Sequence, residues 1–180
     1  MNDTELIRKA DAFAEKAHAG VSRKYSNAPY ITHPRRIKAE VMKLEGATEE
    51  MAAAALLHDV VEDTPIKLET IRAEFGDKVA ELVGWLTNEP KVPGENRAAR
   101  KKKNAARLSG APKDAKRIKM LDRMDNLGEM DYDQARDFCK IYIQESWDLF
   151  HAVANADAVL AERFELVLNE AGLKLGWTEV

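Results

Sequence analysis

One stretch of the chain, residues 52–65, restricts the possible folds more than any other. It begins with Ala-Ala-Ala-Ala-Leu-Leu, a run of small and apolar residues that is typical of a helix buried in a core. Four titratable side chains follow, before Pro65 prevents a regular helix from continuing. They are His58, Asp59, Glu62 and Asp63. Because burying such groups beside a core is costly unless each has a partner, the stretch predicts a buried helix that ends in a polar site.

A divalent metal ion is one partner that these side chains could share. On a continuous helix, His58 and Glu62 would lie on one face, because they are four residues apart. Asp59 and Asp63 would share a face for the same reason. One helical turn could then carry metal ligands and the next turn acid–base groups. The alternative is a solvated or hydrogen-bonded His–Asp pair, which is the common state of such a pair in an arbitrary helix.

Apolar residues recur at helical spacing along the rest of the chain, which predicts an all-α fold, a helical bundle of about eight to ten helices. Capping residues, prolines and glycines mark where these helices begin and end. The expected helices begin near Thr4, Pro34, Thr48, Thr64, Asp77, Pro112 and residues 137 and 156. There is no strand alternation of useful length and no Gly-rich phosphate loop. We expect one domain, residues 1–180, with residues 171–180 as a loose tail.

The composition argues against several classes of protein. The net charge of −3 provides no global basic field for binding DNA or RNA. With Cys139 as the only cysteine, no intrachain disulfide can form, and we expect this residue to pack in a protein of a reducing compartment. The N-terminus lacks the apolar segment of a signal peptide, and no apolar run approaches the ~20 residues that cross a bilayer. We therefore expect a cytoplasmic protein with no nucleic-acid or membrane partner.

A basic segment, residues 97–107, departs from this acidic balance. Its cationic residues are Arg97, Arg100, Lys101, Lys102, Lys103 and Arg107. Such a run is commonly a solvated helix face. It could instead form an electrostatic rim for a phosphorylated ligand, because a local positive patch gains meaning when the remainder of the protein is net acidic. The sequence is compatible with both roles.

Two further polar residues, His33 and Asp122, lie next to apolar helical patterns. The proline after His33 favours extended backbone there, so we expect His33 at the entrance of a helix. A capping or surface role would also explain His33, and a salt bridge to Arg123 or to another helix would explain Asp122. Together with His58 and Asp59, however, these residues make two imidazoles and two carboxylates. That set suits manganese, iron or zinc.

The order His … His-Asp … Asp resembles the HD phosphohydrolase superfamily, and the flanking residues narrow the resemblance to the hydrolase domain of RelA/SpoT. Three segments resemble successive motifs of that domain: residues 17–34, with AHAGVSRK and APYITHP, residues 55–64 and residues 118–127. Between the second and third motifs, residues 75–83 and 86–87 resemble the next two helices of the family. The match covers roughly residues 10–170. No room remains for a synthetase domain, so the chain looks like a stand-alone small alarmone hydrolase with an HD-domain helical bundle.

The resemblance implies an activity, a metal and a set of site residues. The activity is removal of pyrophosphate from the 3′ position of (p)ppGpp, which gives GDP or GTP. One metal ion, usually manganese, is bound. By motif position, the resemblance makes the metal ligands His33, His58, Asp59 and Asp122. The residues that activate or orient the attacking water would be Glu62 and Asp63. Phosphates would be held by Arg23 and Lys24, and the nucleoside would be contacted by Asn126.

Two positions depart from the family pattern. Asp125 stands where the family usually carries His or Tyr, and Gly128 stands where it often carries Arg. Both changes remove groups that could bind the nucleotide, while the metal and water residues remain. The substrate is therefore expected to be a phosphorylated nucleotide, either (p)ppGpp or another one such as a dinucleotide or NADPH. A non-catalytic nucleotide-binding regulatory domain is the third possibility, although a pure binder has no need for Glu62 and Asp63 as water activators.

Overall fold

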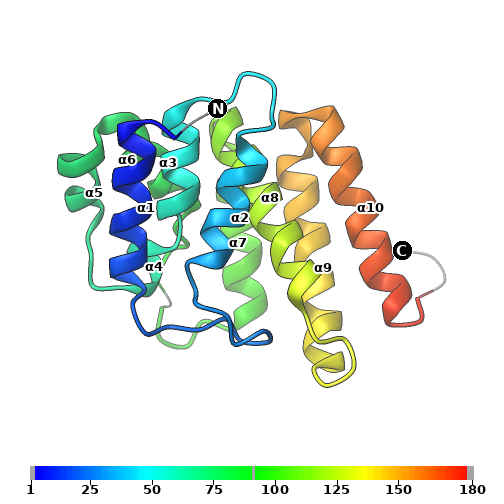
Figure 1. Cartoon of the computed structure of the whole chain (residues 1–180). Coiled ribbons are helices and arrows are strands. Elements are labelled where there is room, and N and C mark those ends of the chain that lie inside the picture. The colour runs from blue at the N-terminus through cyan, green and yellow to red at the C-terminus, as the bar shows by residue number, and fades with distance from the viewer. Residues whose placement is uncertain (1–2, 91, 178–180) are drawn as a thin grey trace. The chain divides into compact units, whose positions relative to one another are not determined.

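The computed structural model describes residues 3–90 and 92–177. These residues form two compact units, divided between Asn88 and Glu89, and each unit is described by itself. The regular structure of the described residues is helical, as Figure 1 shows, which confirms the predicted all-α class. An isolated antiparallel bridge joins Ser22 to Pro29. None of the helices in the described ranges is both long and apolar enough to cross a membrane.

The first unit is organised around α3. Its helices are α1 (Glu5–Ala17), α2 (Thr32–Val41), α3 (Glu49–Leu57), α4 (Val60–Asp63), α5 (Leu68–Phe75) and α6 (Asp77–Leu86). Three of them, α1, α2 and α6, pack against α3, and residues 51–57 are accordingly buried on all sides. The four alanines of residues 52–55 leave room for this close approach, because protein interiors are packed to high density. Thr48 begins α3 as predicted, since its hydroxyl accepts a hydrogen bond from the Met51 amide at 3.2 Å.

The polar end of α3 differs from the prediction of one continuous helix. The helix ends at Leu57, His58 and Asp59 form a turn, and the short helix α4 follows. The backbone of both turn residues stays in the right-handed helical region. A hydrogen bond from the Asp63 amide to the Asp59 carbonyl, at 2.9 Å, closes the turn of α4.

Two other helix starts were placed wrongly. The helix α2 begins at Thr32, so His33 lies inside its first turn and is not extended. Pro34 is tolerated there because the first amides of a helix have no intrahelical partner to lose. The helix α5 begins at Leu68 and not at Thr64, because the Thr64 hydroxyl donates to the Val60 carbonyl and accepts from the Ile66 amide. These bonds hold an extended residue before a proline, which is the geometry that such a position favours.

The second unit is a group of four long helices. They are α7 (Arg97–Ser109), α8 (Lys113–Glu129), α9 (Arg136–Val153) and α10 (Ala158–Lys174), with a 3₁₀ turn at Ala154–Ala156. In Figure 1, α8, α9 and α10 run side by side, and α7 packs against α9. The helix α10 continues four residues into the segment that was predicted to be a loose tail. Residues 178–180 of that segment lie outside the described part of the chain.

Candidate metal centre

Three of the predicted metal ligands come together at the polar end of α3. His33, His58 and Asp59 each place a ligand atom within 4.8 Å of the other two. The Asp59 Oδ2 atom lies 2.9 Å from His58 Nε2 and 3.8 Å from His33 Nε2. Atoms that share one metal ion at about 2.1 Å lie roughly 3–4 Å apart, so these separations fit a common ion. The side chains of His33 and His58 are 1% and 0% exposed, while that of Asp59 is 19% exposed.

A backbone hydrogen bond sets the orientation of the His58 ring. His58 Nδ1 lies 2.8 Å from the Ala55 carbonyl oxygen, which can only accept a hydrogen bond. Nδ1 therefore carries the proton, and in the neutral imidazole the lone pair is on Nε2, the atom that faces Asp59. This arrangement, in which the second ring nitrogen donates to a carbonyl, is the usual one for a metal-binding histidine.

Tyr30 connects the metal-ligand cluster to the next carboxylate. Its hydroxyl donates to Asp59 Oδ2 at 2.5 Å and lies 3.3 Å from Asp63 Oδ2. The ring packs against His18, with centroids 4.5 Å apart. Tyr30 thus orients one predicted ligand and one predicted water-activating residue at the same time. No site role was predicted for it, although it stands in the APYITHP segment together with His33.

His18 is a third buried imidazole beside this cluster. It is the C-cap residue of α1, and its Nε2 atom is buried without a hydrogen-bond partner among the described residues. Burial lowers the pKa of His18, and the neighbouring rings of His58 and His33 add to this effect against the opposing charge of Asp59. A neutral His18 is therefore expected, which makes it a packing partner for Tyr30.

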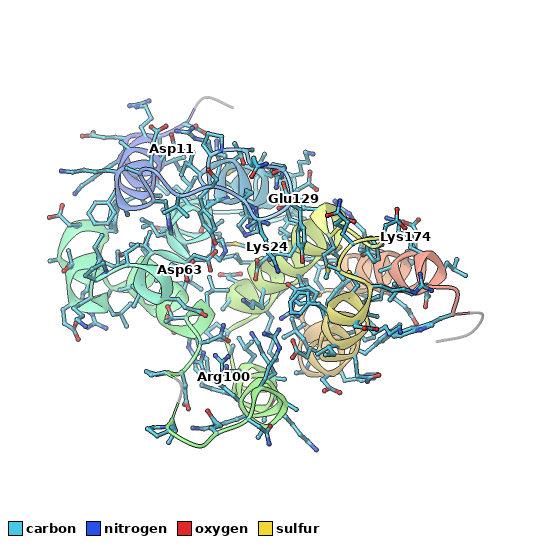
Figure 2. The ribbon with its side chains drawn as sticks, turned by 90° about the horizontal axis from the view of Figure 1, so that it is seen from below. Asp11, Lys24, Asp63, Arg100, Glu129 and Lys174 are labelled. Atoms are coloured by element: carbon cyan, nitrogen blue, oxygen red, sulfur yellow. The ribbon has the colours of Figure 1, made fainter. Side chains whose placement is uncertain are left out.

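The two predicted water-activating carboxylates have different surroundings. Glu62 is anchored by Asn88, whose side-chain amide lies 2.9 and 3.0 Å from the two carboxylate oxygens and whose backbone amide donates at 3.0 Å. Asp63, labelled in Figure 2 at the end of α4, has the contact to Tyr30 instead. Partial burial of its carboxyl group, followed by the charges of Asp59 and Glu62, raises the pKa of Asp63 from 3.8 to about 6.

Arg23 and Lys24, the predicted phosphate ligands, lie in the loop between α1 and α2. The Arg23 guanidinium lies over the Tyr30 ring at 5.4 Å, so it is near the same tyrosine that contacts Asp59. The Lys24 ammonium lies over the Tyr25 ring at 5.1 Å, and the residue, which is labelled in Figure 2, is exposed. The loop thus presents one half-buried and one exposed cation from the first unit.

The remaining predicted site residues, Asp122 and Asn126, belong to α8 in the second unit. Asp122 is buried, pairs with Lys119 at 2.7 Å and accepts a hydrogen bond from the Asn126 side-chain amide at 2.7 Å. Asn126 therefore orients the Asp122 carboxylate within one helical turn. Of the two positions that depart from the family pattern, Asp125 is half-buried, and a Cβ at Gly128 would meet no atom within 4 Å.

Comparisons with known proteins show which family the chain is similar to. A model of the HD domain family matches residues 10–160. A probable guanosine-3′,5′-bis(diphosphate) 3′-pyrophosphohydrolase of Synechocystis is 36% identical over 164 residues, which are 89% of this chain but 21% of that protein. The chain therefore spans about a fifth of the length of that relative.

Two animal proteins match along nearly their whole length. The guanosine-3′,5′-bis(diphosphate) 3′-pyrophosphohydrolase MESH1 of Danio rerio is 27% identical over 181 residues, covering 97% of this chain and 98% of that protein. A solved structure described as a metazoan ortholog of SpoT that hydrolyses ppGpp superposes with a TM-score of 0.78 and 24% identity, covering 98% and 99% of the two chains. The second comparison establishes similarity of fold.

Proposed function

Because the chain belongs to the HD domain family, we propose that it is a metal-dependent hydrolase that removes pyrophosphate from the 3′ position of (p)ppGpp. One observation carries the proposal: the buried cluster of His33, His58 and Asp59, to which Tyr30 joins the Asp63 carboxylate. The names of the relatives from Synechocystis and Danio rerio support the choice of substrate. The products are GDP or GTP and pyrophosphate.

His33, His58 and Asp59 are proposed to hold one divalent ion. Two imidazole nitrogens and a carboxylate oxygen suit manganese, iron or zinc, and manganese is the metal that the family resemblance favours. A divalent ion in such a site lowers the pKa of water and polarises a phosphoryl oxygen. Asp122 is proposed as the fourth ligand on the sequence resemblance, and its contacts with Lys119 and Asn126 support a carboxylate held in a fixed orientation.

Asp63 is proposed to accept the proton of the attacking water. Its carboxylate lies beside Asp59 through the shared contact with Tyr30, so a water near the metal ligands is within reach of it. The water oxygen then forms a bond to the phosphorus at the 3′ position, and the bond between that phosphorus and the ribose 3′ oxygen breaks. The 3′ oxygen leaves with the electron pair of that bond and takes up a proton from solvent, which gives the 3′-hydroxyl group of GDP or GTP. Glu62, anchored by Asn88, is proposed to orient the same water.

The substrate is held by charge and hydrogen bonding. Arg23 is suited to bidentate contact with phosphate oxygens, and Lys24 adds a point charge. Asn126 is proposed to contact the nucleoside part. Phosphoryl transfer depends mostly on positioning and charge neutralisation, so no nucleophilic side chain is required.

Another phosphorylated nucleotide, such as NADPH, is the second candidate substrate. The observation that favours it is the open space above Gly128, where the family often carries an arginine. Without an arginine at residue 128, fewer protein groups would contact the nucleoside part of the substrate, and this is compatible with a different base or a longer nucleotide. A non-catalytic regulatory domain fits less well, because the Asp63 carboxylate is coupled to the cluster through Tyr30.

The first experiment is to incubate metal-stripped protein with ppGpp, with and without Mn²⁺, and to separate the products. Metal-dependent release of GDP and pyrophosphate is expected. The Asp63→Asn variant, purified in the same way, controls for contaminating hydrolases. If folded, Mn²⁺-loaded protein forms no product from ppGpp, the substrate assignment is wrong, and a panel that includes NADPH then tests the second candidate.

A further inference from the structure

The basic segment of residues 97–107 forms most of α7, and its cations differ in their surroundings. Lys103 pairs with Glu89 on the surface, and Lys102 is exposed. Arg97 and Lys101 are four residues apart on the helix and therefore share a face. Figure 2 labels Arg100, the residue before Lys101, on this helix. The segment is thus not a uniform solvated face.

Two arginines from different helices contact the same turn of α9, residues 142–146. From α7, Arg97 makes a two-pronged ion pair with Glu145, at 2.6 and 2.8 Å. From α8, the Arg123 guanidinium lies 4.4 Å from the centre of the Tyr142 ring and donates to Ser146 Oγ at 3.2 Å. Because residues 142–146 span about one turn, the shared face of α7 and the Arg123 side of α8 meet there.

The charges at this place do not balance. Arg97 is paired with Glu145, and Lys119 is paired with Asp122 at 2.7 Å. Lys101 and Arg123 have no ion pair with any of the described residues. Arg123 is only 6% exposed, and within the described ranges its buried Nε–H has no hydrogen-bond partner. Glu145 also attracts Lys101, but it is already paired with Arg97, so the four cations Arg97, Lys101, Lys119 and Arg123 share two carboxylates, Glu145 and Asp122. This excess of positive charge is costly, because burial and like charge both disfavour the charged form of a lysine.

The effect on Lys101 agrees with this geometry. Burial, followed by the positive charges of Arg123 and Lys119, lowers the pKa of Lys101 to about 8. At neutral pH the ammonium group is still mostly protonated, so the unfavourable charge persists. An anion would relieve it.

We propose that Lys101 and Arg123, with Lys119 beside them, bind a diphosphate group of the nucleotide. This inference rests on the proposed function for its choice of ligand. A planar guanidinium with an unused Nε–H suits bidentate contact with phosphate oxygens, and an ammonium group adds a mobile point charge. The diphosphate could be the one that is released as pyrophosphate or the one at the 5′ position. Both present the same chemistry to these side chains.

Isothermal titration of the metal-free, full-length chain with pyrophosphate and with GDP tests the proposal. The variants are Lys101→Met, which removes the charge but keeps most of the chain length, and Lys102→Met as the exposed neighbour. We expect Lys101→Met to weaken binding of at least one of the two ligands by about tenfold or more, as the loss of a charge-assisted contact does. Lys102→Met should change the affinity less than about twofold by comparison. Guanosine, which has no phosphate, should bind both variants equally.

The pattern of results assigns the diphosphate. Dependence of pyrophosphate binding on Lys101 indicates the released group, and dependence of GDP binding alone indicates the 5′ group. Equal affinities of Lys101→Met and Lys102→Met for both ligands would overturn the proposal. This outcome is separate from the hydrolysis assay, because binding is measured without metal. If the protein hydrolyses ppGpp but Lys101→Met binds both ligands normally, the proposed function stands and the diphosphate site is wrong. If Lys101→Met weakens binding but the protein does not hydrolyse ppGpp, the diphosphate site stands and the proposed substrate is wrong.

Discussion

The Tyr30 hydroxyl donates a hydrogen bond to Asp59 Oδ2 at 2.5 Å, and it thereby joins the loop before α2 to the turn after α3. The loop leads directly into α2, whose first turn contains His33, and the turn after α3 contains the His58–Asp59 pair. A group that holds a ligand from outside is usually as important to the site as the ligand itself, because it sets the direction of the lone pairs.

The Tyr30→Phe variant is expected to lose about 10–100-fold in metal affinity or in turnover, the usual cost of losing such an outer hydrogen bond. Tyr25→Phe is the matched control, since the Tyr25 hydroxyl is buried without a hydrogen-bond partner among the described residues. Metal titration and steady-state kinetics measure both variants. If the two variants behave alike, Tyr30 contributes only its ring.

The Asp63→Asn variant is expected to lose turnover by about 100-fold or more, the scale of general-base catalysis, while it binds the substrate normally. The reason is that an amide cannot accept the proton of water, whereas the contact with Tyr30 is kept. Single-turnover kinetics and titration with substrate separate the two effects. Normal turnover of this variant would show that the water role belongs to another residue.

Metal binding is expected to stabilise the folded protein. An ion at about 100 times its dissociation constant adds about 2.7 kcal/mol to the free energy of unfolding. For a chain of this size, that corresponds to a rise in melting temperature of roughly 5–10 °C. Asp122→Asn should reduce the shift produced by Mn²⁺, and Asp125→Asn, a change of the same kind on the same helix, should not. Equal shifts in the two variants would remove Asp122 from the ligand set.

Replacing glycine by alanine is expected to change the free energy of unfolding in opposite directions at Gly128 and Gly76. Gly128→Ala should raise the free energy of unfolding by about 0.5–1 kcal/mol, because the position is helical and a Cβ there meets no atom within 4 Å. Gly76→Ala should lower it by about 1–2 kcal/mol, because Gly76 has a φ of 85°, which an alanine adopts only with strain. Chemical denaturation of both variants checks the pair. Destabilisation by Gly128→Ala would mean that the end of α8 needs a glycine.

The lowered pKa of Lys101 predicts a pH dependence of stability. Its ordinary value is 10.5, and in the folded protein it is about 8. Between these values the unfolded chain binds the proton and the folded protein does not, so the free energy of unfolding rises with pH across this range. Relative to Lys101→Met, the native protein should gain on the order of 1 kcal/mol between pH 7.5 and 10, after a discount for solvent screening. Denaturation at both pH values measures the difference, and a constant difference would contradict the prediction.

Local patterns were enough to predict most of the fold. Thr48 begins α3, Gly76 separates α5 from α6, and the alanine run is buried, because capping and packing depend on residues close in sequence. The start of α5 was predicted wrongly because a side chain redirects the backbone there. Thr64 delays the start of α5 through two hydrogen bonds of its own, and such bonds compete with helix formation without changing the apolar pattern.

The candidate site was predicted in part. The structure brings together His33, His58 and Asp59, which the motifs had indicated, and leaves the ligand role of Asp122 a prediction. Tyr30 and Asn88 were missed because their partners are distant in the chain: 29 residues separate Tyr30 from Asp59, and 26 separate Asn88 from Glu62. A tyrosine in a loop and an asparagine after a helix are ordinary residues at those positions. Only the packing of the first unit shows what they hold.

The hydrogen bond between His58 Nδ1 and the Ala55 carbonyl has a consequence for how this protein could change over evolutionary time. The carbonyl belongs to the last turn of a buried helix, where backbone acceptors must find a partner outside the regular pattern. His58 therefore serves the fold as well as the chemistry. Substitution of His58 is therefore expected to destabilise the fold even where the activity is no longer needed, because it would leave the buried Ala55 carbonyl without this hydrogen bond. An intact His58 in a relative is thus weak evidence for retained activity, and Asp63, whose side chain contacts the Tyr30 hydroxyl rather than a backbone carbonyl, is the more informative position.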